Sequence, residues 1–82
     1  MGLTKLTEKV TEYNQRLERG KASKIKPSHV EKILAKLKEK ADELEANIAS
    51  AGSKDKKARL EKKLGVATAQ IARAEWLLKE IT

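Results

Sequence analysis

The feature that most constrains this chain is the spacing of its apolar residues between Ser28 and Ile81. They form two runs in which the spacing alternates between four and three residues, the heptad pattern of helices that pack along a seam. Helices that did not pack together would have no reason to match in register. When the chain is folded back at residue 54, however, the two runs meet in six layers: Val30 with Leu78, Leu34 with Ala74, Leu37 with Ile71, Ala41 with Ala67, Leu44 with Leu64, and Ile48 with Leu60. We therefore predict a long antiparallel coiled-coil hairpin over residues 28–81.

The composition fits a single all-α domain spanning residues 1–82. The chain has no Phe, one Trp and one Tyr, so its apolar positions are almost all aliphatic. This is a composition suited to helix packing rather than to sheets. The charged fraction of 38% is high for a globular domain but ordinary for a coiled coil. We expect helices over about residues 3–19, 28–51 and 55–81.

The first of these helices precedes the hairpin and is too short to be stable alone, so it must dock on another surface. Thr4 is its expected N-cap, and Gly20 stands where a left-handed residue would end it. Residues 20–27 form a linker, in which we expect Ile25 to turn inward between the helices. The helix is predicted from apolar residues spaced three and four apart: Leu3, Leu6, Val10, Tyr13 and Leu17.

Local signals also mark the ends of the two long helices. Ser28 followed by Glu31 resembles a capping box at the start of the second helix. Ser53 or Asp55 can cap the third helix. Gly65 lies inside the third helix, where it costs about 1 kcal/mol relative to Ala.

Extra apolar positions indicate where the first helix docks. Ile33 and Leu77 face each other on one flank of the seam, and Val66 and Ala69 extend that flank on the third helix. These positions lie toward the open end of the hairpin. We therefore predict a three-helix up-down-up bundle at that end and a protruding two-helix tip over residues 45–63. The alternative is that the first helix is exchanged between two chains, or that the same flank mediates dimerisation.

The side chains needed for catalysis are scarce. The chain has no Cys, and His29 is its single histidine, at an expected exposed helix start. The carboxylates at residues 42–45 fall on a helix face with no pocket in prospect, and the sequence has no Gly-rich phosphate loop. We expect no enzymatic activity, no catalytic or metal site, no cofactor and no small-molecule substrate.

The basic residues are the strongest functional signal. The net charge is +7, and residues 53–63 carry six cations against two carboxylates. A lysine-rich helical arm can contact nucleic-acid phosphates without reading bases. Lysine is also the ordinary residue of solvated helix faces, and aromatic residues for base stacking are nearly absent. The candidate anion contacts are Lys54, Lys56, Lys57, Arg59, Lys62, Lys63, Lys32 and Lys36.

Trp76 and Arg73 form a second candidate site on the third helix. In one interpretation Trp76 anchors a protein partner, since Trp is a common hot-spot residue. In the other, it seals the first helix against the bundle and makes a cation–π contact with Arg73.

The sequence as a whole favours a small helical interaction or scaffold module that binds a protein partner or a second copy of itself. The alternative is a nonspecific nucleic-acid-binding protein that uses the basic tip. No apolar run approaches the roughly 20 residues needed to span a bilayer. We expect a cytoplasmic protein that does not bind membranes.

Overall fold

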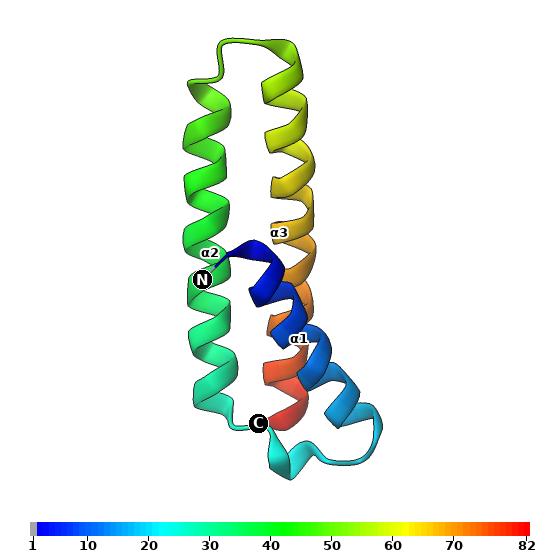
Figure 1. Ribbon diagram of the computed structural model, residues 1–82. Coiled ribbons are helices and arrows are strands. Elements are labelled where there is room, and N and C mark those ends of the chain that lie inside the picture. Colours follow the sequence, from blue (N-terminus) through cyan, green and yellow to red (C-terminus); the bar gives the residue numbers. More distant parts are fainter. Residues whose placement is uncertain (1) are drawn as a thin grey trace.

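The structure, a computed structural model, describes residues 2–82 and contains three α-helices. These are α1 (Leu3–Glu18), α2 (Pro27–Ala49) and α3 (Lys54–Ile81), with a short 3-10 turn, η1 (Ala22–Lys24), between the first two. The molecule is a rod with extents of 46 × 18 × 18 Å. Figure 1 shows α2 and α3 side by side along this rod, with α1 packed across the half opposite their connecting turn. The predicted all-α three-helix bundle with a protruding tip is confirmed.

The seam between α2 and α3 is made of the predicted apolar residues, and their pairing in six layers remains a prediction. Every one of its twelve apolar residues is buried or half-buried, and α2 packs on α3 more extensively than on α1. Leu37, Ala67 and Ala74 are wholly removed from solvent. Supercoiling of the two helices, which the heptad spacing implies, remains a prediction.

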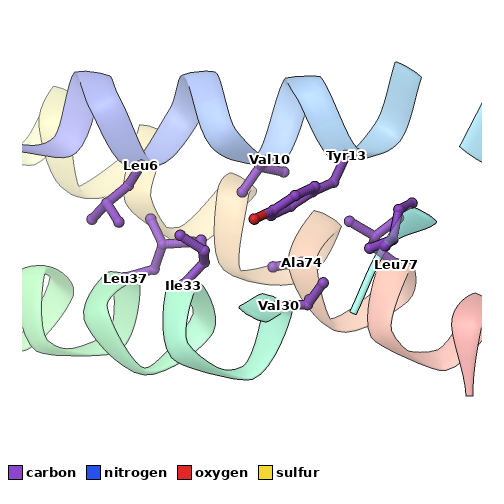
Figure 2. Close-up of a cluster of buried hydrophobic side chains, with 9 residues drawn as sticks. Leu6, Val10, Tyr13, Val30, Ile33, Leu37, Ala74 and Leu77 are labelled. Carbon is purple, nitrogen blue, oxygen red and sulfur yellow. The ribbon is translucent and has the colours of Figure 1, made fainter. Parts of the chain in front are cut away.

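Docking of α1 creates the main core at the base of the hairpin, the end opposite the α2–α3 turn. Leu6, Val10 and Tyr13 point from α1 toward the flank of the hairpin, as Figure 2 shows. They meet Ile33 and Leu77, which are 7% and 0% exposed, as the extra apolar positions predicted. Burying a large aliphatic side chain of this kind contributes roughly 1.5–3 kcal/mol. In this arrangement α1 packs on its own hairpin.

The end of α1 and the linker also fold as expected. Gly20 adopts φ +73°, and its N–H donates to the Leu17 carbonyl at 3.0 Å while the Lys21 N–H donates to the Arg16 carbonyl at 2.8 Å. This pair of bonds is a Schellman motif, which needs a left-handed residue at this point. Ile25 is 3% exposed and belongs to the core cluster, so its predicted inward turn is confirmed.

Two predicted N-caps are wrong. α2 begins at Pro27 with Lys26 as its N-cap, so Ser28 lies inside the helix rather than before it. The reason is that Pro is pre-organised for the first helical position and has no N–H to leave unpaired there. α1 is capped by Gly2 rather than by Thr4, with no side-chain hydrogen bond.

The N-cap of α3 is confirmed as Ser53, the first of the two candidates. Its hydroxyl oxygen accepts a hydrogen bond from the Lys56 N–H at 3.2 Å. Asp55 lies in the first turn of the helix, where its negative charge is favourable to the helix dipole. α3 therefore starts with both a cap and a compensating charge.

Candidate interaction groove

A groove opens at the point where α1 begins and the two-helix tip continues without it. We call it the tip groove; its volume is about 840 Å³. The first turns of α1 close one end, and α2 and α3 form the two sides. The residues that line it are Leu3, Thr4, Thr7, Glu8, Lys40, Glu43, Leu44, Asn47, Arg59, Leu60, Lys62, Lys63 and Val66.

The apolar part of the tip groove consists of Leu3, Leu44, Leu60 and Val66. Leu44 and Leu60 belong to the α2–α3 seam. Leu44 is 9% exposed and Leu60 is half-buried, so each contributes only the edge of its side chain to the groove. Val66 is 42% exposed. The prediction that α1 covers Val66 and Ala69 is therefore wrong, since both are exposed while Ile33 and Leu77 are buried. α1 begins at Leu3, beside the groove that Val66 lines, so it does not extend over Val66.

The two sides of the groove differ in charge. On the α2 side, the Lys40 ammonium lies 3.5 Å from a carboxylate oxygen of Glu43, so these charges largely compensate each other. On the α3 side stand Arg59, Lys62 and Lys63, and within residues 2–82 none of them has a carboxylate in ion-pair distance. The positive potential of the groove therefore comes from α3.

The structure divides the predicted anion contacts into three groups. Arg59, Lys62 and Lys63 line the tip groove. Exposed lysines in the first turn of α3 lie beyond the lining of the groove: Lys54, Lys56 and Lys57. Lys32 and Lys36 are on the half of α2 nearer the base, and Lys36 is about 20 Å from the end of α2 at 1.5 Å per residue.

The surroundings of Lys36 are not strongly positive. It lines a small polar hollow of about 250 Å³ together with Glu39, Lys40 and Glu43. Two carboxylates therefore balance two ammonium groups at this point. A single anion site that joins Lys36 to the lysines of the tip does not form in this arrangement.

Trp76 lies on the outer side of α3 and is 48% exposed. α3 contributes Leu77 and Ala74, not Trp76, to the buried core that α1 covers. The cation–π contact found among residues 2–82 joins Arg16 to Tyr13, with 5.5 Å from the guanidinium carbon to the ring centre, rather than Arg73 to Trp76. A partner-anchoring role for Trp76 and Arg73 remains a prediction.

Sequence reasoning missed the role of Arg16. Its guanidinium pairs with Glu12, lies over the Tyr13 ring and donates to the Lys24 carbonyl at 3.4 Å. Arg16 thus ties the end of α1 to the linker.

Sequence reasoning also missed the tip groove, because it assigned Leu44 and Leu60 wholly to the seam. The signal that could have indicated the groove was the apolar residue Val66 on the flank of the hairpin.

Other kinds of site are not found in the part of the chain that the structure describes. No group of three His, Cys, Asp or Glu side chains in residues 2–82 is placed to hold a metal ion. Over the same residues, no helix has the length and apolar character to cross a membrane.

Comparison of the chain with protein-family models, curated proteins and solved structures gave no match.

Proposed function

We propose that this protein is a small, non-catalytic helical interaction module that binds a helix of a protein partner in the tip groove. The observation that carries this proposal is an apolar surface left open where α1 begins. Helix-in-groove recognition needs such a surface and a partner with apolar residues on one face.

The binding mode has a precedent inside the molecule. α1 seats Leu6, Val10 and Tyr13 against α2 and α3 at the base, with the spacing of a helix that lies along a groove. The tip groove extends the same track between the same two helices, starting from Leu3. A partner helix in the tip groove would therefore continue the packing that α1 begins.

The test uses a fluorescent synthetic peptide with Leu at i, i+3, i+4 and i+7 and uncharged polar residues elsewhere. We expect the peptide to bind the intact protein in an anisotropy titration, and Val66→Glu to abolish that binding. Ala72→Glu is the matched control, because it places the same charge on an exposed position of α3 outside the groove lining. Binding that responds equally to both substitutions, or no binding at all, contradicts the proposal.

A second candidate function is binding of nucleic-acid phosphates by the lysines in the first turn of α3. It is supported by the exposure of Lys54, Lys56 and Lys57 and by the net charge of +7. These lysines lie outside the groove lining, so the two functions are separable. If this candidate is correct, duplex DNA binds at low salt and the triple change to Glu weakens it, whereas Val66→Glu does not. Absence of DNA binding by the unaltered protein eliminates it.

A further inference from the structure

We infer that the partner helix is acidic along one flank, contacts the groove over about two turns, and lies with that flank against Arg59, Lys62 and Lys63. This inference rests on the proposed function and specifies the chemistry of the partner. It follows from the charge asymmetry, the spacing of the cations and the length of the groove.

The charge asymmetry is the first argument. Lys40 and Glu43 compensate each other on the α2 side, whereas the three cations of the α3 side have no carboxylate in ion-pair distance within residues 2–82. The start of α1 adds to the positive potential, since its first turn contains no acidic residue and the N-terminal end of a helix dipole is positive. Glu8 is the one further carboxylate that lines the groove. A partner with uncompensated carboxylates on one side is therefore favoured over a basic one.

The spacing of the cations is the second argument. Arg59, Lys62 and Lys63 stand at positions i, i+3 and i+4, so they lie close together along one side of α3. Carboxylates on a partner helix at the same spacing form a matching row, like the flanking charges that select partners in coiled coils. The exposed side chain of Val66 follows one turn later and marks the apolar edge of the same surface.

The length of the partner follows from α3. The groove lining on α3 runs from Arg59 to Val66, seven residue steps or about 10.5 Å at 1.5 Å per residue. A helix of about two turns fills this length, with its apolar face on Leu60 and Val66.

The other occupants fit less well. A nucleic acid would leave the apolar surface uncovered, and among residues 2–82 no aromatic side chain lines the groove to stack on its bases. A second copy of this chain carries the same net charge of +7, and the apolar face of its α1 is already buried. An acidic amphipathic helix satisfies both the apolar surface and the positive side.

Two synthetic peptides of equal length and identical Leu pattern test the inference. One carries Glu at the positions flanking α3, and the other carries Lys at those positions. We expect the Glu peptide to bind the intact protein about tenfold more tightly at low salt, since three exposed ion pairs replace three like-charge contacts. The preference should nearly vanish at 1 M salt, where the Debye length is about 3 Å.

Charge-reversal variants locate the preference. Changing Arg59, Lys62 and Lys63 together to Glu should reverse it. The same triple change at Lys54, Lys56 and Lys57 alters the net charge equally and should leave it in place. Circular dichroism of both variants establishes that the helices are retained.

The outcomes separate this inference from the proposed function. Equal binding of the two peptides, abolished by Val66→Glu, retains the interaction groove but overturns the acidic partner. Loss of the preference in the control triple variant alone also overturns it, because the charges that select the partner then lie outside the groove. If neither charged peptide nor the uncharged peptide binds, both proposals are overturned together. Self-association seen by light scattering and abolished by Val66→Glu would replace them with dimerisation through the groove.

Discussion

The substitution Gly65→Ala tests how closely the structure of α3 explains its stability. Gly65 lies in the interior of α3, and a Cβ atom built on it meets no heavy atom within 4 Å apart from its chain neighbours and the adjacent backbone of its own helix. Its φ is not positive, since Gly20 is the glycine with that conformation among the described residues. Ala therefore fits without strain and without a lost contact. We expect the free energy of unfolding to rise by about 1 kcal/mol, the difference in helix propensity between Gly and Ala.

The assay is urea unfolding followed by far-ultraviolet circular dichroism, with thermal unfolding as a second measure. For a domain of this size, 1 kcal/mol corresponds to a rise in Tm of about 4–8 °C. The exposed Ala69 lies one turn further along α3, and Ala69→Gly should lower stability by a similar amount. Gly20→Ala is the opposite control, because φ of +73° costs a residue with a Cβ roughly 1 kcal/mol or more. A Gly65→Ala variant that is less stable than the parent would refute the assignment of this site as open helix surface.

Three further predictions concern the core, the caps and the tip. Leu6→Ala should lower the free energy of unfolding by about 2–5 kcal/mol in urea, because Leu6 is 0% exposed and its removal leaves a cavity under α1; a loss within 0.5 kcal/mol would show that α1 is not docked in solution. Ser53→Ala should lower the free energy of unfolding by about 1 kcal/mol, whereas Ser28→Ala should change it by no more than about 0.5 kcal/mol, because Ser53 caps a helix and Ser28 does not. Equal losses of stability in thermal unfolding would contradict the cap assignment. Native-state hydrogen exchange should give lower opening free energies for residues 45–63 than for the helices around Leu37, and uniform protection would contradict a bare tip.

Much of the fold was predictable because each helix carries an independent periodic signal. The matched layers from Val30–Leu78 to Ile48–Leu60 constrain the hairpin register, since shifting one helix by a residue would misalign all of them. The apolar flank at Ile33 and Leu77 then placed α1 at the base. These predictions depend on the sum of many side chains, so no single local error could overturn them.

The predictions that failed depended on single residues. Ser28 matched a capping signature, but Pro27 extended the helix by one residue toward the linker. Val66 was expected beneath α1, yet the point where α1 starts leaves 42% of this side chain exposed. Helix ends shift by a residue or two at little energetic cost, so sequence patterns define them less sharply than they define a seam.

The candidate site was predictable in part. The sequence indicated the basic tip, including Arg59, Lys62 and Lys63, but not that these three share a groove with Leu44 and Leu60. The sequence already favoured a protein partner over a nucleic acid. The apolar surface beside the cations depends on where α1 begins in three dimensions, and it is the reason why we propose a helix as that partner.

The tip groove is the binding surface that we propose for this protein. The most direct measurement is an amide ¹⁵N–¹H NMR titration of the full chain with the peptide that carries Glu along one flank. We predict that the largest chemical-shift changes fall on residues that line the groove, with Leu3, Leu44, Leu60 and Val66 among them. Changes confined to the lysines in the first turn of α3 or to the surroundings of Trp76, with the groove residues unaffected, would contradict the account.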